Sequence, residues 1–167
     1  GYKAYWDDGS QVVPPHDKGI IAEVDNVTGM DQVKLMDYDE AVAKGLIHLE
    51  GEEMDAAFLD AVLKQRLRAD VIAESPLRIV FTPLHGVGGT VTPRALEMWG
   101  FQNVFPEPEQ MQPNGDFPTA ASPNPEEGKA LERAIELAGQ VSGDLVLATD
   151  PDADRLGIAV LHEGLAL

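Results

Sequence analysis

The sequence predicts an α/β fold with three layers, α/β/α, around a small mixed sheet of about four strands. Residues 55–161 alternate between helical and strand-like periodicity in the order α, β, α, β, α, β, loop, β. A glycine-rich loop at 83–89 joins a strand to a helix, as at the start of an α/β unit. The last two strands are joined by a short loop only, so they should form an antiparallel hairpin, which makes the sheet mixed.

Composition indicates a globular protein and argues against several classes of partner. The 167 residues are 44% hydrophobic and 25% charged, enough for one domain with a core and part of another. A formal net charge of −17 argues against nucleic acid or an anionic membrane as a partner. The sequence has no cysteine and no apolar run of membrane-spanning length, so we expect a cytoplasmic protein without disulfides.

The first 54 residues carry weaker patterns. Residues 2–6 alternate apolar and polar side chains, which predicts a half-buried strand with its aromatic residues in the core. After a pair of prolines, four apolar residues at helical spacing predict a helix. They are Ile20, Ile21, Val24 and Val27. Residues 33–51 are polar and weakly patterned, and we interpret them as a connector with a short helical turn near 40–44.

Residues 55–73 predict one continuous helix, because acids gather at its start, bases gather at its end and an apolar stripe follows one face. The stripe is Leu59, Val62, Leu63 and Leu67. Residues 77–82 then form a strand, 83–89 the glycine loop, and 90–99 a helix that ends at Gly100. The expected inner face of this helix is Val91, Ala95, Met98 and Trp99.

A short strand at 103–105 is followed by a long irregular stretch, 106–123, which contains five prolines. Loops of that length in a compact domain are usually functional or mobile. The sequence Asn124-Pro-Glu-Glu127 predicts the N-cap and acidic first turn of a helix that ends near Gly139. The stripe of that helix is Leu131, Ala134, Ile135 and Ala138.

The loop between the last two strands, Asp150-Pro-Asp-Ala-Asp-Arg155, carries the strongest chemical signal. Carboxylates at alternate positions of a tight turn, Asp150, Asp152 and Asp154, can converge on one point. Three hard oxygen donors suit a hard divalent cation, Mg²⁺ before Ca²⁺. A solvated acidic turn is the plain alternative. The strict spacing, the position after a strand and the adjacent Arg155 favour a metal site.

Two other acidic loops fit these residues less well. In an EF-hand, the glycine position would be occupied by Arg155 and the twelfth-position glutamate by Leu161. Phosphatases of the haloacid-dehalogenase type also place a pair of aspartates after a strand. Their fifth residue is usually Thr or Val, whereas this chain has Asp154.

The loop His85-Gly-Val-Gly-Gly89 permits two interpretations. Glycines between a strand and a helix allow either backbone contact with an anion or close packing of the strand on the helix. The loop matches neither the P-loop nor the dinucleotide-binding pattern. His85 is interpreted as either a buried polar residue or a wall of the site. The other histidines, His16, His48 and His162, have no metal-binding spacing.

Four motifs in order resemble the α-D-phosphohexomutases, the phosphoglucomutase/phosphomannomutase family. The 150–155 loop is similar to the metal-binding loop of that family, and Phe81-Thr-Pro-Leu-His-Gly-Val-Gly-Gly89 to the start of its second domain. Asp116-Phe-Pro-Thr119 with Pro123-Asn-Pro-Glu-Glu127 resembles the branch that contains phosphoglucomutases and phosphopentomutases. Gly1-Tyr-Lys3 is similar to the stretch that follows the phosphoserine loop.

The resemblance implies a domain organisation and a reaction. Residues 1–54 would be the C-terminal end of domain 1 with a linker, and residues 55–167 would be domain 2, the metal-binding domain. A phosphoserine would give its phosphate to a sugar monophosphate and take the other phosphate back from the bisphosphate intermediate. The reaction would interconvert sugar 1- and 6-phosphates or pentose 1- and 5-phosphates.

The resemblance also assigns roles to individual residues. Asp150, Asp152 and Asp154 would bind Mg²⁺, which would offset the charge that develops during phosphoryl transfer. Arg155 would contact the phosphoryl group, a role that suits its planar guanidinium. Lys3 would help to position or protonate the reacting groups.

The serine loop of the family has no counterpart in residues 1–167, so we expect an excised segment of a longer protein. Its partners would be a phosphosugar substrate and the remaining domains of the same chain. Alone, the segment is predicted to have no mutase activity. Two alternatives stay open: a non-catalytic acidic module for metal binding or interaction, and a phosphatase with Asp150 as nucleophile.

Overall fold

The computed structural model describes residues 3–162 and 165–166. The chain forms two compact units, Gly1–Leu49 and Glu50–Leu167. Each unit is described by itself. Within the described residues, no helix has both the length and the apolar character needed to cross a membrane.

The first unit contains α1 (His16–Asp25), a 3-10 turn η1 (Met30–Gln32) and α2 (Tyr38–Ala43). These elements confirm the predicted helix and the short helical turn in the connector. The predicted strand at 2–6 is wrong over its described residues. Only an isolated antiparallel bridge joins Tyr5 to Gln11, around a turn in which Gly9 has a φ of 79°. A strand needs a neighbouring strand for its backbone hydrogen bonds, and the described part of this unit offers no sheet.

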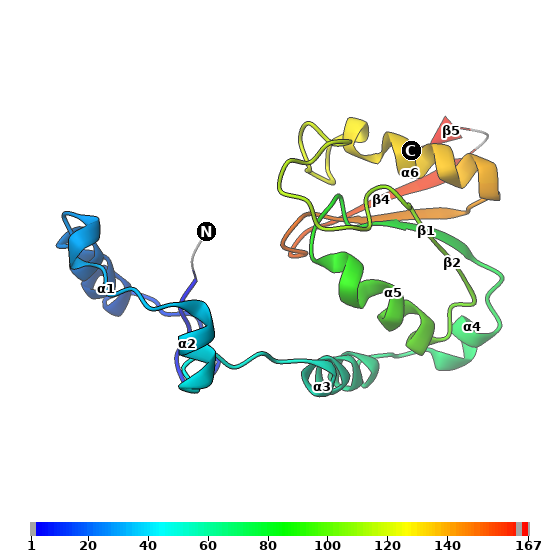
Figure 1. The fold of residues 1–167 in the computed structure, drawn as a ribbon. Coiled ribbons are helices and arrows are strands. Elements are labelled where there is room, and N and C mark those ends of the chain that lie inside the picture. The colour runs from blue at the N-terminus through cyan, green and yellow to red at the C-terminus, as the bar shows by residue number, and fades with distance from the viewer. Residues whose placement is uncertain (1–2, 163–164, 167) are drawn as a thin grey trace. The chain divides into compact units, whose positions relative to one another are not determined.

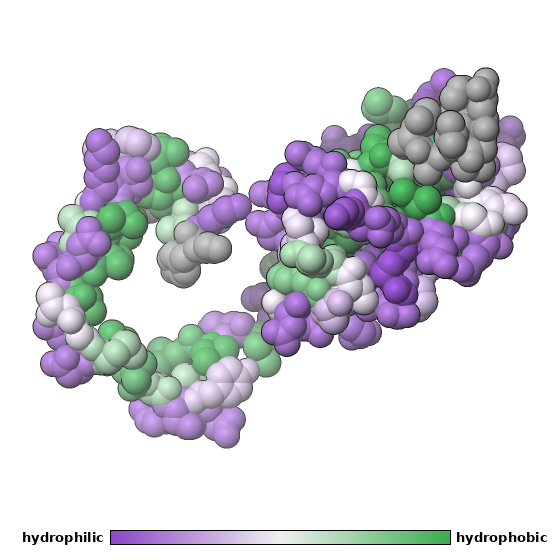
Figure 2. Space-filling model, turned by 90° about the horizontal axis from the view of Figure 1, so that it is seen from above, coloured by the Kyte–Doolittle hydropathy of each residue, from purple (hydrophilic) through white to green (hydrophobic). Residues whose placement is uncertain are grey.

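The first unit buries little apolar surface. Among the described residues of this unit, Ala41 is the single buried hydrophobic residue, and α1 contains no buried residue. The stripe predicted from helical spacing is therefore present but exposed, with Ile21 57% and Val24 60% exposed. Figure 2 shows hydrophobic side chains at the surface of this unit. The expected burial of the aromatic residues is also wrong, since Tyr5 and Trp6 are exposed.

The second unit is built on a five-stranded mixed sheet with the order β2-β1-β3-β4-β5 (Figure 1). The strands are β1 (Arg78–Thr82), β2 (Asn103–Pro106), β3 (Leu145–Thr149), β4 (Leu156–His162) and β5 (Leu165–Ala166). β1 pairs in parallel with β2 and β3, while β4 runs antiparallel to both β3 and β5. The mixed sheet and the hairpin are confirmed, and the two-residue β5 is an addition to the prediction.

Helices on both faces of the sheet give the predicted three layers (Figure 1). α6 (Gly128–Val141) packs on β1 and β3. On the other face α5 (Gly88–Trp99) lies by β2, with α3 (Glu52–Leu63) and α4 (Ala69–Ala73) against α5. The core under α6 consists of small and medium apolar side chains, which let the helix approach the sheet closely. They are Val80, Leu131, Ala134, Val146, Ala148 and Ala159.

The predicted helix over 55–73 is interrupted, because α3 and α4 are separate helices. Leu67, the last residue of the predicted stripe, lies in the break and is 93% exposed. Arg66 in the same break donates from Nη1 to the backbone carbonyl of Trp99 at 2.7 Å. An unbroken helix would be about 28 Å long, well beyond the length of α5. The break instead lets α4 turn back onto α5.

The two helices that flank the sheet differ from prediction at particular residues. In α5 the buried apolar side chain is Leu96, outside the predicted stripe, and Met98 is exposed. α5 packs on the sheet and on α3 and α4, so its buried surface is broader than one stripe. In α6 the predicted stripe is confirmed, with Leu131 and Ala134 buried and the other two members packed against the core.

Both boundaries of α6 lie further along the chain than predicted. Residues 124–127 form a turn, in which the Glu127 N–H donates to the Asn124 carbonyl at 3.0 Å. Asn124 is therefore not the N-cap, and the helix begins at Gly128. At the other end the helix continues past Gly139, and Ser142 takes the left-handed conformation that ends it, with a φ of 52°.

Candidate functional site

The aspartate loop, residues 150–155, connects β3 to β4, and the pairing of these strands closes it at its base. Inside the loop the Ala153 N–H donates to the Asp150 carbonyl at 3.0 Å, and Ala153 has a φ of 62°. This turn brings Asp150, Asp152 and Asp154 together. One carboxylate oxygen from each lies within 4.8 Å of the other two. The structure thus places the three aspartates as their alternate spacing predicts.

Asp150 and Arg155 form the fixed part of this loop. The Asp150 carboxylate is 3% exposed and accepts from the Arg155 backbone N–H at 3.0 Å and from Nε at 2.9 Å. Burial by itself would raise the pKa of Asp150. The hydrogen bonds from the Arg155 backbone and side chain, together with the positive charge of Arg155, outweigh it and hold the pKa below its ordinary value. Asp150 is therefore ionised at neutral pH.

The donor set fits a hard divalent cation. Mg²⁺ with bonds of about 2.0–2.1 Å holds its ligand oxygens about 3–4 Å apart, so the three carboxylates need only a small closure. Asp152 and Asp154 are exposed, while Asp150 is buried. The open side of the loop therefore leaves room for water or another oxygen ligand, as Mg²⁺ prefers. Binding of Mg²⁺ stays a prediction.

The glycine loop packs directly behind the aspartate loop. A Cβ on Gly86 would lie 2.3 Å from the Pro151 Cα, and one on Gly88 would lie 2.5 Å from Thr149 Oγ1. The Val87 N–H donates to the Pro151 carbonyl at 2.9 Å. These contacts favour the packing interpretation of the glycines over the anion-binding one, because both glycines are buried against protein.

His85 is a buried residue that holds the long loop. It is 4% exposed, its Nε2 lies 2.8 Å from Thr119 Oγ1 and its Nδ1 lies 3.3 Å from the Gln112 carbonyl. Its backbone N–H also donates to the Gln110 carbonyl at 3.0 Å. Both Leu84 and His85 have positive φ, 48° and 63°, a strained conformation for residues with side chains. Of its two interpretations, the structure supports the buried polar residue.

A chain of side-chain hydrogen bonds supports this strained turn. The Leu84 N–H donates to Thr82 Oγ1 at 3.1 Å, and the Thr82 hydroxyl lies 2.6 Å from Gln110 Oε1. Gln110 Nε2 then donates to Thr119 Oγ1 at 3.0 Å, and Thr119 meets His85. Every hydrogen bond in this series has one donor and one acceptor when the neutral His85 carries its proton on Nδ1. Nδ1 then donates to the Gln112 carbonyl, and Nε2 accepts from the Thr119 hydroxyl. The Leu84–His85 turn is therefore held at Leu84 by Thr82 and at His85 by Thr119 and Gln112.

The sequence offered no signal for this series of side-chain hydrogen bonds. Gln110 lies inside the long irregular stretch, yet it is fully buried. Its partners lie 28 residues before it and 9 residues after it. The length of the stretch predicted only that it is functional or mobile.

Glu107 fixes the start of the same stretch to α6. Its carboxylate is 4% exposed and accepts from the Gln110 N–H at 2.8 Å. It also accepts from Nε and Nη2 of Arg133 at 3.3 Å, and Arg133 pairs in addition with Glu109. The long irregular stretch is thus attached at Glu107, at Gln110 and at Thr119 rather than loose.

The remaining predicted residues belong to the first unit or have side chains outside the described residues. Lys3 belongs to the first unit, so its assignment to the site stays a prediction. His16 packs edge-on against Trp6 with ring centroids 5.6 Å apart. His48 is exposed. The side chain of His162 lies outside the described residues.

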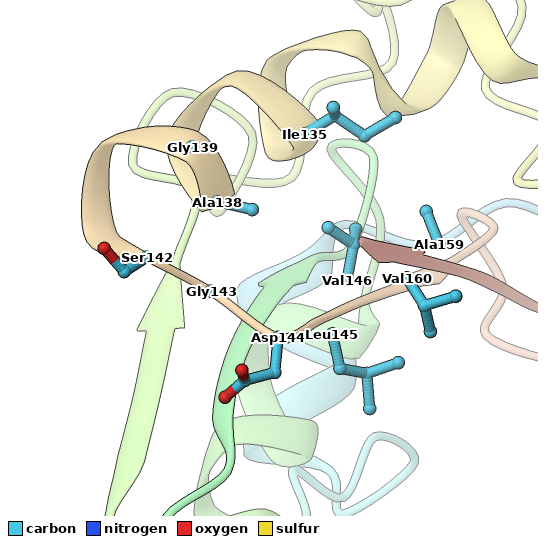
Figure 3. A pocket seen from close by; sticks show the side chains of 10 residues that line it. All are labelled: Ile135, Ala138, Gly139, Ser142, Gly143, Asp144, Leu145, Val146, Ala159 and Val160. Atoms are coloured by element: carbon cyan, nitrogen blue, oxygen red, sulfur yellow. The ribbon is translucent and has the colours of Figure 1, made fainter. Parts of the chain in front are cut away.

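A hollow of ≈ 610 Å³ lies under the C-terminal end of α6 and beside the start of β3 (Figure 3). It is lined by Ile135, Ala138, Gly139, Ser142, Gly143, Asp144, Leu145, Val146, Ala159 and Val160. The aspartate loop follows the other end of β3, and no residue of that loop lines the hollow. The hollow has one carboxylate and otherwise mostly apolar walls, so the aspartate loop remains the candidate site.

The order of the motifs, the three-layer fold and the convergent aspartates agree with a comparison with known families. Residues 56–164 match the family described as phosphoglucomutase/phosphomannomutase, alpha/beta/alpha domain II. The chain belongs to this family. The aspartate loop lies inside the matched range. The branch suggested by residues 116–127 is represented among the curated relatives.

Three such relatives illustrate the match. A phosphopentomutase from Homo sapiens is 37% identical over 95% of this chain, and a phosphoribomutase from Saccharomyces cerevisiae is 35% identical over 96%. A glucose 1,6-bisphosphate synthase from Mus musculus is 35% identical over 98%. The chain spans about a quarter of their length: 26%, 27% and 26%.

Solved structures share the fold. A phosphoglucomutase/phosphomannomutase family protein from Burkholderia thailandensis has a TM-score of 0.53 and 19% identity. It aligns over 72% of this chain and 26% of its own. A phosphomannomutase homologue from Thermus thermophilus has a TM-score of 0.54 and 22% identity, over 68% of this chain and 25% of its own.

Proposed function

We propose that this chain supplies the metal-binding domain of a Mg²⁺-dependent phosphosugar mutase. The observation that carries the proposal is the convergence of Asp150, Asp152 and Asp154 within 4.8 Å beside Arg155, in a member of this family. The longer protein would interconvert sugar 1- and 6-phosphates, or pentose 1- and 5-phosphates, through a phosphoserine and a bisphosphate intermediate. The names of the curated relatives favour phosphorylated pentoses and hexoses as substrates.

The residues of the loop would divide the work. The three aspartates would hold Mg²⁺, and the bound ion would stabilise the negative charge of the transferring phosphoryl group. Arg155 would bind that group with the edge of its guanidinium that does not face Asp150. Lys3 would help to position or protonate the reacting groups. The remaining domains of the chain would contribute the serine and the sugar-binding groups.

The two alternative functions would require different properties of the aspartate loop. A phosphatase that uses Asp150 as nucleophile needs a carboxylate oxygen that can reach a phosphorus atom. Both oxygens of Asp150 are engaged by Arg155 and the group is 3% exposed, which argues against that role. A non-catalytic acidic module would need Asp152 and Asp154 only as surface charges, and would not need Arg155 held in place.

The test is a turnover assay of the longer protein that contains this chain. We expect Mg²⁺-dependent conversion of ribose 1-phosphate or glucose 1-phosphate, lost on chelation. Asp152→Asn should reduce the rate strongly, and Asp116→Asn, an exposed aspartate outside the loop, should not. Equal rates for the two variants would reject the proposed role of the loop. Absence of any sugar-phosphate turnover would favour the non-catalytic module.

A further inference from the structure

Asn124 connects the turn before α6 to the aspartate loop. Its Oδ1 accepts from Arg155 Nη1 at 3.2 Å and from the Glu126 N–H at 3.2 Å. Its Nδ2 donates to Glu127 Oε1 at 3.3 Å. The side-chain amide thus faces donors at one end and a carboxylate at the other.

These partners determine the orientation of the amide. A flipped Asn124 would turn its NH₂ group toward the guanidinium of Arg155 and its oxygen toward the Glu127 carboxylate. A donor would then face a donor at Arg155, and an acceptor would face an acceptor at Glu127. The orientation described above is therefore the one that the surroundings allow. An aspartate would keep the acceptor for Arg155 and lose the donor to Glu127. An apolar residue would lose both.

The turn that carries Asn124 is seated directly on β4. A Cβ on Gly157 would lie 2.2 Å from the Pro125 carbonyl oxygen, so only glycine permits this approach. Gly157 pairs with Ala148, the second pair from the aspartate loop, and follows Arg155 by two residues. Pro125 is itself buried. The turn and Arg155 are therefore held against the same strand, which keeps Asn124 at a fixed distance from the guanidinium.

We infer that Asn124 is a positioning residue that orients the Arg155 guanidinium for contact with a phosphoryl group; the purpose of this contact rests on the function proposed above. Asp150 holds Nε and Asn124 holds Nη1, and these two atoms together with Cδ define the plane of the guanidinium. Among the described residues, Nη2 has no hydrogen-bond partner, and the Arg155 side chain is 48% exposed. That edge of the guanidinium is available to a phosphoryl oxygen.

Hydrogen exchange at Arg155 Nε measures this orientation without any catalytic assay. In the ¹⁵N-labelled full 167-residue chain, the resonance is assigned by its loss in Arg155→Lys. We expect Asn124→Ala to speed exchange at Arg155 Nε by about tenfold, because one hydrogen bond to the guanidinium is lost. Asn114→Ala is the matched control. The Asn114 side chain accepts from the Asp116 N–H at 2.9 Å in an exposed turn, so its loss should leave the rate unchanged.

A rescue pair separates positioning from general loss of structure. Asn124→Asp alone should give intermediate exchange, since its new carboxylate is repelled by Glu127. Combining it with Glu127→Gln restores a donor opposite the carboxylate, and exchange should return to within about twofold of the parent chain. Exchange that stays unchanged in Asn124→Ala, or that the double variant fails to restore, would overturn the inference.

Kinetics of the longer protein add a readout that a merely structural residue would not move. Asn124→Ala should lower kcat about tenfold and change KM little, with the urea midpoint within the range of the Asn114→Ala control. Faster exchange at Arg155 supports the positioning role even if the longer protein proves not to be a mutase. Unchanged exchange refutes that role even where mutase activity is established.

Discussion

Gly86 and Pro151 lie so close that no side chain fits between them. A Cβ built on Gly86 would be 2.3 Å from the Pro151 Cα and 2.5 Å from its carbonyl oxygen. The glycine loop after β1 is thus the support on which the aspartate loop after β3 rests. Support by backbone rather than by side chains leaves little room for the three carboxylates to shift.

Gly86→Ala should therefore damage the site and the fold together. The added methyl group must push the backbone of Pro151 aside, which we expect to lower the free energy of unfolding by about 1–3 kcal/mol. Urea unfolding of the purified chain measures this. Gly139→Ala in α6 is the control, because no atom lies within 4 Å of its Cβ and alanine favours a helix by about 0.5–1 kcal/mol. If Gly86→Ala were as stable as the control, the close approach would be disproved.

Gln110→Leu should break the chain of hydrogen bonds that fixes the Leu84–His85 turn. The substitution leaves the hydroxyls of buried Thr82 and half-buried Thr119 with fewer partners, at a cost of about 2 kcal/mol or more. Thermal or urea unfolding reports the cost. The same substitution at exposed Gln112 should change stability by less than about 0.5 kcal/mol. Similar effects at the two positions would argue against a supporting role for the Gln110 side chain.

Glu107→Gln should loosen the start of the 106–123 stretch. The neutral side chain weakens a partly buried ion pair with Arg133, which also pairs with Glu109, so the loss should be about 1–2 kcal/mol. Glu109→Gln, at a 61% exposed side chain, should cost less than about 0.5 kcal/mol. Faster proteolysis within the 106–123 stretch in the first variant alone would identify the affected segment. Equal unfolding midpoints in the two variants would contradict this view.

Mg²⁺ should bind this chain weakly. The site offers three carboxylates and no phosphoryl oxygen of its own, and Mg²⁺ is seldom held by carboxylates alone. Calorimetric titration should show a weak site whose affinity falls about tenfold or more in Asp152→Asn and is unaffected by Asp116→Asn. Tight binding, or binding insensitive to Asp152, would show that the carboxylates act differently.

The parts of the fold that could be predicted depend on local sequence. The aspartate loop lies between two apolar runs, and carboxylates at alternate positions of such a tight turn can converge, as they do here. The stripe of α6 is equally local, because Leu131 and Ala134 recur at helical spacing on the face that meets the sheet.

The parts that could not be predicted depend on distant contacts. The break between α3 and α4 brings Arg66 to a carbonyl 33 residues away. Asn124 carries a good N-cap signal, yet it is used in a turn and bonds to Arg155, 31 residues later. The strand expected at residues 2–6 failed for a related reason, since a strand requires neighbours that its own sequence does not specify.

Ala153 has a consequence for the rate at which a ligand could be captured. Its φ of 62° is one that alanine adopts only under constraint, and it lies between Asp152 and Asp154. A turn restrained in this way has few alternative shapes, so little ordering remains to be done when a cation arrives. We expect association to be limited by how fast Mg²⁺ sheds its water shell rather than by motion of the loop. Replacing Ala153 with glycine would make the loop more flexible, so that more ordering would have to accompany cation binding.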